Sequence, residues 1–238
     1  MTAPILIGGN GHSGTRIFAQ ILEHNGVFMG IPRVTRSHYS HDLYMFDLLD
    51  RWVGPYLAGS LDENARRQMD SQFRRRLRLL FPLRPRRWGW KNPRSMLLLP
   101  FYHRLFPDLR FIHVIRDGRD ITLGNELAVN NPYATLLLDE AEQSLRPEER
   151  MILFWGRSNQ AAMDYGRANL NRNYLFVRWE SLCQNPEPEV RRILAFCNLG
   201  MTKLESPCRM VQLPRSIGRW KQAEPDLRTR IVSAGSPY

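Results

Sequence analysis

The sequence predicts an α/β fold, a three-layer sandwich in which helices flank a central parallel sheet. Three apolar runs carry this prediction, because each is too short for a helix and lacks the polar alternation of a half-exposed strand. They are Ile5–Ile7, Phe111–Ile115 and Tyr174–Val177. Segments with helical spacing separate them, and strands that alternate with helices form parallel sheets. No repeat or composition shift divides the chain, so we expect one domain over residues 1–238.

The elements of the first half follow from local patterns. After the first strand and a run of glycines, Ile17–Leu22 predicts an amphipathic helix, and Val27–Gly30 a second strand. Leu43, Phe46, Leu49 and Val53 predict a further helix. Residues 60 and 63 are Ser and Glu, the spacing of a capping box, ahead of an apolar stripe that repeats every four residues. That stripe consists of Leu61, Ala65, Met69, Phe73 and Leu77.

Two later helices are predicted to begin at prolines, because proline loses no hydrogen bond at the first helical position. Pro147 is followed by two glutamates, which favour the positive end of the helix dipole. Pro186 begins a helix whose apolar residues are Val190, Ile193, Leu194 and Cys197. Residues 82–87 are rich in proline and arginine and predict a loop within the domain.

The composition is that of a folded, basic protein. The chain carries 34 Lys and Arg against 23 Asp and Glu, a formal net charge of +11, which predicts an anionic partner. Hydrophobic residues make up 43%, which excludes disordered and low-complexity classes. Three cysteines, none in a metal-binding pattern, favour a reduced cytoplasmic protein without a metal site. The chain passes directly from Met1 into a strand, and no run of about 18 apolar residues predicts a transmembrane helix.

A glycine-rich loop, Gly8–Arg16, connects the first strand to the first helix. One possible role of such a loop is structural: the glycines form a tight turn between the strand and the helix and bind no ligand. Its backbone N–H groups and the positive end of the helix dipole can also bind a phosphate. Ser13, Thr15 and Arg16 can each donate to phosphate oxygens, which favours a phosphate site. The Walker A lysine is absent, because Thr15 and Arg16 directly follow Gly14, and this disfavours hydrolysis of ATP or GTP.

Further motifs follow this loop along nearly the whole chain. They are Trp88–Pro93, Phe111–Asp120, Phe176–Leu182 with Asn185-Pro186, and Ser216–Lys221, after Gly11–Thr15 in the loop itself. In this order they resemble the sulfotransferases that use 3′-phosphoadenosine 5′-phosphosulfate (PAPS), and the chain is most similar to bacterial-type members. The resemblance implies a P-loop nucleoside-triphosphate-hydrolase-like fold. It also implies sulfuryl transfer from PAPS to a hydroxyl acceptor, with adenosine 3′,5′-bisphosphate as the product and no metal required.

The resemblance also implies the site residues. The expected cofactor-binding residues are Gly11, His12, Ser13, Gly14, Thr15, Arg16, Arg116, Gly124, Trp179, Ile217, Gly218 and Arg219. Arg116 matches the family's ligand of the 3′-phosphate, and it lies where a buried strand ends, as ligand-binding residues of parallel sheets do. An ion pair with Asp117 or Asp120 is the alternative role of Arg116. Lys91, His12 and Ser216 are the expected catalytic residues beside the transferred group.

The loop and the 3′-phosphate segment depart from the family pattern. Cytosolic and tyrosylprotein members carry Lys or Arg where this chain has His12, which is a cation only when protonated. We therefore expect Arg16 to supply a permanent charge there. The family's 3′-phosphate serine falls at Gly124, so its backbone N–H, Thr122 or Asn125 would take its place.

The general base is absent from both positions that the family uses. Pro93 occupies the histidine position of cytosolic members, and residues 30–32 replace the glutamate region of tyrosylprotein members. Asp42, in the polar stretch 37–42, is the predicted catalytic base, with His41 and His38 as the next candidates. A helix cap for the segment that begins at residue 43 is an equally good role for Asp42.

Nine arginines between residues 66 and 87 concentrate much of the positive charge. They predict either a solvated helix face or a docking surface for an acidic acceptor or an anionic membrane. Two other function classes fit a basic chain with a glycine loop: a P-loop-type kinase, and a non-enzymatic nucleic-acid-binding protein. The missing Walker lysine disfavours the first, and the absence of a nucleic-acid recognition motif disfavours the second. We expect the acceptor to be a carbohydrate or another small metabolite, with no nucleic-acid partner.

Overall fold

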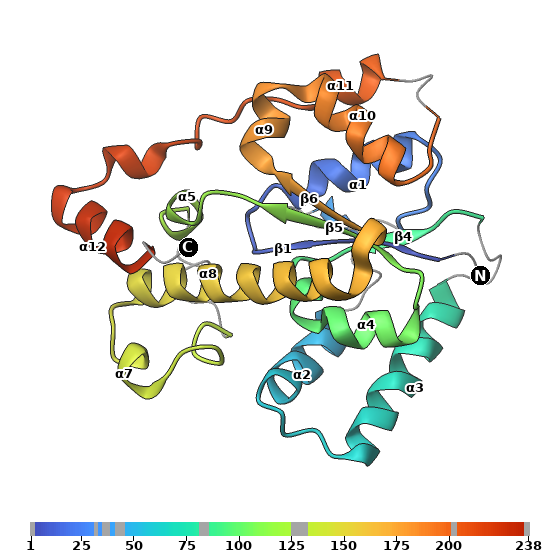
Figure 1. Ribbon diagram of the computed structural model, residues 1–238, viewed down its shortest axis with the longest axis horizontal. Helices are drawn as coiled ribbons and strands as arrows, with labels where there is room; N and C mark the ends of the chain where they lie inside the picture. The colour runs from blue at the N-terminus through green and yellow to red at the C-terminus, as the bar shows by residue number, and fades with distance from the viewer. Residues whose placement is uncertain are drawn as a thin grey trace.

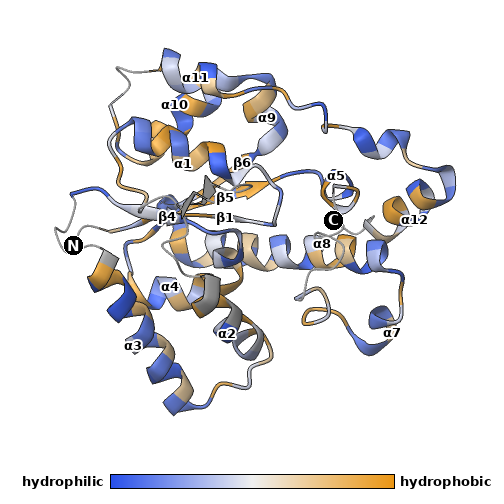
Figure 2. Cartoon of the chain, turned by 180° about the vertical axis from the view of Figure 1, so that it is seen from behind, coloured by the Kyte–Doolittle hydropathy of each residue, from blue (hydrophilic) through white to orange (hydrophobic). Residues whose placement is uncertain are grey.

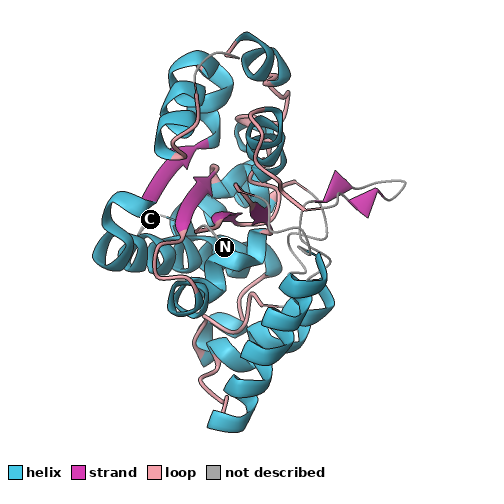
Figure 3. Ribbon diagram, turned by 90° about the vertical axis from the view of Figure 1, so that its right-hand side faces the viewer, coloured by secondary structure: helices cyan, strands magenta, loops and turns pink. Residues whose placement is uncertain are grey.

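The computed structural model describes residues 3–30, 33–34, 39–40, 46–80, 86–124, 133–200 and 204–235. Within them a four-stranded parallel sheet, in the order β4-β1-β5-β6, lies between two layers of helices (Figure 1). The strands are β1 (Ile5–Gly9), β4 (Gly89–Lys91), β5 (Arg110–Ile115) and β6 (Tyr174–Arg178). The predicted α/β sandwich with a central parallel sheet is confirmed, and Figure 3 shows its layers from the side.

The three apolar runs form strands because the sheet buries both of their faces. All five residues of β1 are buried, and β1 pairs with β4 on one side and β5 on the other. β6 completes the sheet beside β5, with Val114 opposite Val177. The carboxyl ends of all four strands therefore lie along one edge of the sheet, toward α5 in Figure 1.

One helical layer consists of α1 (Thr15–His24), α9 (Trp179–Gln184), α10 (Pro186–Phe196) and α11 (Glu205–Met210). Phe18 and Ile21 of α1 and Val190 and Ile193 of α10 are fully buried in the core beneath these helices. The helix predicted to begin at Pro186 does so, and its predicted apolar residues are all buried.

The opposite layer contains α2 (Phe46–Leu57), α3 (Glu63–Leu80), η1 (Pro93–Leu98), α4 (Leu99–Leu105) and α8 (Pro147–Tyr165). Phe73 of the predicted stripe lies within 5.8 Å of the ring centres of Trp90, Phe101 and Tyr102. Figure 2 shows hydrophilic residues over most of α3, in contrast to the apolar strands. Among the described residues, no helix is both long and apolar enough to cross a membrane.

The remaining elements are short or peripheral. They are β2 (Arg33–Val34), β3 (Tyr39–Ser40), α5 (Gly118–Thr122), α7 (Glu140–Gln143), η2 (Gly166–Leu170), η3 (Asn171–Asn173), η4 (Arg219–Gln222) and α12 (Pro225–Gly235). β2 and β3 form an antiparallel pair apart from the main sheet. α12 packs on α8 and α5 and so places the C-terminal segment beside the carboxyl edge of the sheet.

Two local predictions were wrong. Val27–Gly30 is not a strand, because only Phe28 pairs with Trp88, and the chain then turns at Gly30, which has a φ of 85°. The capping box also fails, because α3 begins two residues later than expected. Asp62 caps it by accepting a hydrogen bond from the Ala65 N–H at 2.7 Å, whereas the Ser60 hydroxyl donates to the Pro55 carbonyl. Leu43 and residues 82–85 lie outside the described residues.

A buried histidine in β5 makes stability depend on pH. His113 is fully buried, with Nδ1 2.8 Å from the Tyr174 hydroxyl and Nε2 3.0 Å from the Asn159 amide oxygen. Because that oxygen only accepts, Nε2 carries the proton and the neutral ring is satisfied. Burial lowers the pKa of His113 to about 4, against the hydrogen bond to Asn159, which raises it.

Below the ordinary histidine pKa, His113 is therefore protonated in the unfolded state but not in the folded state. The free energy of unfolding falls as the pH drops through this range. At pH 5 the loss relative to pH 7 is about 2 kcal/mol from this residue alone. Urea denaturation at the two pH values measures it. In His113→Gln the difference between pH 7 and pH 5 should shrink by that amount; an unchanged difference would assign the pH dependence to other groups.

Candidate functional site

The carboxyl edge of the sheet brings the predicted site residues together. The glycine loop follows β1, Lys91 is the last residue of β4, Arg116 follows β5, and Trp179 follows β6. Parallel strands end at one edge, so four segments that are distant in the sequence meet there. The C-terminal segment that contains Ser216 reaches the same edge through a contact with Arg116.

Two glycines of the glycine loop lie where a side chain would not fit. A Cβ atom on Gly9 would lie 2.2 Å from the Val114 carbonyl oxygen. Gly14 has a φ of 77°, and a Cβ atom there would lie 2.6 Å from the Trp179 ring. His12 adopts a φ of 65°, a left-handed conformation that is uncommon outside glycine. The loop is therefore folded tightly against β5 and Trp179, directly before α1.

Several polar atoms at this edge are buried without a hydrogen-bond partner in the described part of the chain. They are Ser13 Oγ, Thr122 Oγ1, Arg116 Nε and Trp179 Nε1. Leaving one such group unsatisfied costs roughly 1–3 kcal/mol, so folded proteins rarely keep several together unless a ligand or water satisfies them. These four atoms together therefore indicate a binding site for a polar ligand.

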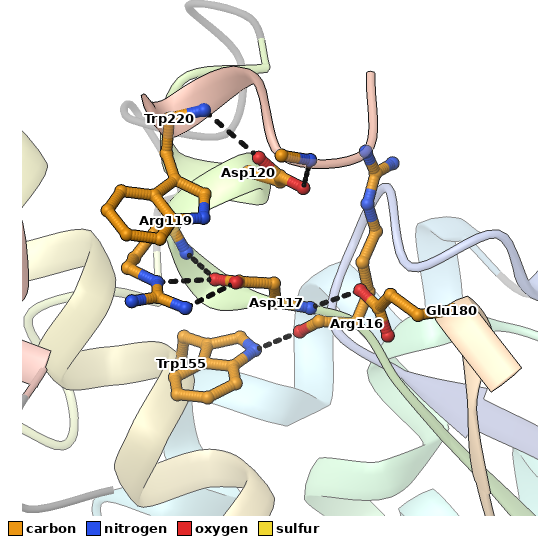
Figure 4. Close-up of polar contacts among 8 residues, drawn as sticks. Arg116, Asp117, Arg119, Asp120, Trp155, Glu180 and Trp220 are labelled. Carbon is orange, nitrogen blue, oxygen red and sulfur yellow. Dashed lines mark hydrogen bonds and ion pairs between the residues drawn. The ribbon is translucent and has the colours of Figure 1, made fainter. Parts of the chain in front are cut away.

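Arg116 links the glycine loop to the C-terminal segment. Its Nη1 donates to the His12 carbonyl at 3.1 Å, and its Nη2 donates to the carbonyl and the hydroxyl of Ser216, at 3.0 and 2.9 Å. The Arg116 carbonyl accepts from Trp155 Nε1 at 3.0 Å, and the next N–H donates to Glu180 at 2.8 Å (Figure 4). The alternative ion pair with an acid of its own motif is not present: Asp117 pairs with Arg119, at 2.6 Å.

A second connection, absent from the sequence predictions, runs from α5 to the C-terminal segment. The buried carboxylate of Asp120 accepts the N–H groups of Gly218, at 2.7 Å, and Trp220, at 3.2 Å (Figure 4). The Asp120 carbonyl accepts Arg219 Nε at 2.8 Å, and the Arg119 guanidinium lies 3.8 Å from the centre of the Trp220 ring. These contacts, which we call the α5 clamp, hold residues 218–220 against the site.

The α5 clamp places the Arg219 guanidinium close enough to the Arg116 guanidinium for the two to repel each other. Burial and the nearby positive charge of Arg116 both lower the pKa of Arg219. The Arg219 guanidinium occupies the space beside Gly124, where a Cβ atom would lie 2.4 Å from Nη2. An anion bound between Arg116 and Arg219 would offset this repulsion, and the hydroxyl of Thr122, the last residue of α5, is available as a donor.

Lys91 is buried, with 8% of its surface exposed, and does not belong to a surface loop. It lies opposite Ile7 in the β1–β4 pair, and the next residue, Asn92, donates its N–H to the Ile7 carbonyl at 3.2 Å. The Asn92 side chain caps η1 by accepting from the Arg94 N–H. Lys91 is thereby held beside the start of the glycine loop.

The remaining residues predicted for the site include exposed residues, one that packs on the core, and several outside the described residues. Gly11, His12 and Arg16 are exposed, and Arg16 lies in the first turn of α1. Ile217 packs against the apolar core that contains α1. The candidate bases Asp42, His41 and His38, together with Asn125, lie outside the described residues. The sequence missed Asp120, as well as Asn10 in the loop, whose amide donates to the Ser158 hydroxyl of α8 at 3.2 Å.

The architecture and these motifs agree with comparisons to known proteins. The model of the sulfotransferase family matches residues 4–203. This chain belongs to the sulfotransferase family. The match includes the glycine loop, Lys91, Arg116 and Trp179, whereas the segment held by the α5 clamp lies beyond it.

The known proteins that this chain resembles share little of its sequence. A Caenorhabditis briggsae protein with the provisional name protein-tyrosine sulfotransferase is 28% identical over 144 residues, 60% of this chain and 45% of that protein. The sulfotransferase domain from the curacin biosynthetic pathway aligns with a TM-score of 0.60 at 15% identity, over 99% of this chain and 98% of its own. A mouse sulfotransferase complexed with PAP has a TM-score of 0.52 at 11% identity, over 98% and 82%. These structures confirm the P-loop-like sulfotransferase fold.

Proposed function

We propose that this protein transfers a sulfuryl group from PAPS to a hydroxyl acceptor and releases adenosine 3′,5′-bisphosphate. The observation that carries this proposal is the pair of guanidiniums, Arg116 and Arg219, beside a glycine loop that can bind a second anion at the same carboxyl edge. A ligand with two separated phosphate-type groups matches both places. The PAP bound to the mouse structure is a ligand of this kind.

Each end of the ligand would have its own set of residues. The loop Gly11–Thr15 and the start of α1, with Arg16, would hold the 5′-phosphosulfate. Arg116 and Arg219 would hold the 3′-phosphate, with Thr122 in place of the family serine and Gly124 leaving room for a guanidinium. The remaining proposed contacts come from Trp179, Ile217 and Gly218. The buried atoms without partners fit this assignment, because they lie in both sets.

Sulfuryl transfer needs the acceptor and leaving oxygens in line and the developing negative charge stabilised. PAPS supplies the activated sulfuryl group when bound. The buried ammonium of Lys91 would stabilise charge there more strongly than an exposed one, because few waters screen it. His12 and Ser216 would assist; the Ser216 hydroxyl accepts from Arg116 and keeps its own proton to donate. Asp42 stays the proposed base.

A carbohydrate or other small metabolite is the proposed acceptor. A peptide tyrosine is the second candidate, which the provisional name of the Caenorhabditis briggsae relative favours. A screen with sulfur-labelled PAPS distinguishes them, using saccharides, simple phenols and a tyrosine peptide as acceptors. We expect PAPS-dependent label on one class of hydroxyl compound. Turnover of the tyrosine peptide alone would overturn the small-metabolite proposal, and label on none of the acceptors would contradict the transfer itself.

A further inference from the structure

A large groove lies at the opposite edge of the sheet, where the strands begin. Its volume is about 1180 Å³, and its lining comes from the starts of β1 and β5, the segment before β4, and the end of α10. Its charged residues are Arg86, Arg87, Arg110, Arg172 and Asp108. Ligand pockets typically measure about 300–1,000 Å³, so the groove has room for more than a single ion.

The groove carries a net positive charge. Its four arginines and one aspartate sum to +3. The carboxyl ends of α1 and α10 also lie here and contribute about half a negative charge each, which leaves a net charge of about +2. Arg87 has a local role, since its Nη2 donates to the Asn198 carbonyl beyond α10 at 3.2 Å. This hydrogen bond ties Arg87 to the backbone just beyond α10.

The arginines are spread along the edge. Arg86 and Arg87 precede β4, Arg110 begins β5, and Arg172 lies in η3 just before β6. β4 and β6 are three strand positions apart in the sheet, and neighbouring strands lie about 4.8 Å apart, so the charges extend over about 14 Å. A single phosphate could not contact all of them. A chain of anionic groups could.

The groove is separate from the candidate active site. Five residues of β5 lie between Arg110 in the groove and Arg116 at the other edge, so the two arginines are six residue steps, or about 20 Å along an extended strand, apart. Two of the nine arginines in the run between residues 66 and 87 belong to the groove, whereas Arg74 and Arg75 are exposed on α3 and do not line it. The run is thus not one surface.

We propose that this groove binds a linear ligand with at least two phosphate or sulfate groups. Guanidiniums pair with such tetrahedral oxyanions through two parallel hydrogen bonds, which favours arginine over lysine in this role. Nucleic acid is a poorer fit, because stacking of bases needs exposed aromatic faces. Of the aromatic residues that line the groove, Trp88 is fully buried, and Phe28 and Phe196 are partly buried. This proposal does not depend on the transfer activity proposed above.

Calorimetric titration of the full chain with inorganic tripolyphosphate, at about 0.15 M salt, tests the proposal. The groove variant is Arg86→Glu with Arg172→Glu, both exposed positions. The matched control is Arg74→Glu with Arg75→Glu, which changes the net charge equally. We expect the groove variant to lose at least about tenfold in affinity and the control less than about threefold. The single variant Arg172→Glu repeats the test if the double variant unfolds in a thermal melt.

Titrations with other ligands distinguish a phosphate-bearing ligand from a sulfated one. A sulfated oligosaccharide that binds more tightly than tripolyphosphate, with the same loss in the groove variant, would identify a saccharide ligand and support the proposal. Equal losses in the groove and control variants would overturn it, since they would reflect net charge alone. Displacement of tripolyphosphate by adenosine 3′,5′-bisphosphate would place binding at the other edge and also overturn it. Tighter binding of a single-stranded oligonucleotide would overturn it in favour of nucleic acid.

Discussion

Replacing Arg116 with alanine should weaken binding of adenosine 3′,5′-bisphosphate by about a thousandfold, or about 4 kcal/mol. The change removes the guanidinium proposed to hold the 3′-phosphate. It also removes three hydrogen bonds that join the glycine loop to Ser216. Arg116→Lys keeps the charge but not the fork of donors, so we expect an intermediate loss. Titration calorimetry in magnesium-free buffer measures all of these affinities.

Arg178→Ala is the matched control for this experiment. Arg178 also ends a strand of the same sheet, but it is exposed. We expect its affinity for the bisphosphate to stay within about threefold of the unchanged protein, because exposed charges are largely screened. If Arg116→Ala bound as tightly as Arg178→Ala, Arg116 would have no part in the 3′-phosphate site.

Replacing Lys91 with alanine should lower kcat by about a hundredfold to a thousandfold and leave bisphosphate affinity nearly unchanged. The buried ammonium is proposed to act on charge that develops only during transfer, so its loss affects the transition state more than the bound ground state. Single-turnover rates with labelled PAPS and the acceptor found in the screen measure the effect. A thermal melt verifies that the variant is folded.

Lys221→Ala provides the comparison, because Lys221 is an exposed lysine near the same edge. It should keep kcat within about threefold. A Lys91→Ala protein with unchanged kcat and a raised KM would show that Lys91 contributes to binding alone, which would contradict its proposed role in the transition state.

The sheet and the positions of the main site residues could be predicted from the sequence, because apolar runs reveal the buried strands and the site residues follow directly after them. Strands buried on both faces are uninterrupted apolar runs, and residues at their carboxyl ends meet at one edge. Arg116 could therefore be placed opposite the glycine loop from the sequence. The residue that caps α3 could not be predicted from the sequence. Asp62 and Ser60 are both good caps, and only the packing of the helix selects between them.

The α5 clamp could not be predicted for another reason. The carboxylate of Asp120 accepts backbone N–H groups of residues about 100 positions away, and every non-proline residue has such a donor. Likewise, the groove arginines belong to three separate segments of the sequence, and only the parallel sheet brings them to one edge.

The central claim is that the carboxyl edge binds a nucleotide with two separated phosphates and needs no metal to do so. Titration of the protein with adenosine 3′,5′-bisphosphate in magnesium-free buffer tests it most directly, with adenosine 5′-monophosphate and magnesium ATP as comparisons. We predict a Kd of about 1 µM or below for the bisphosphate and at least about tenfold weaker binding of the monophosphate, which lacks the group for Arg116 and Arg219. Equal affinity for the two, or binding of magnesium ATP alone, would contradict it.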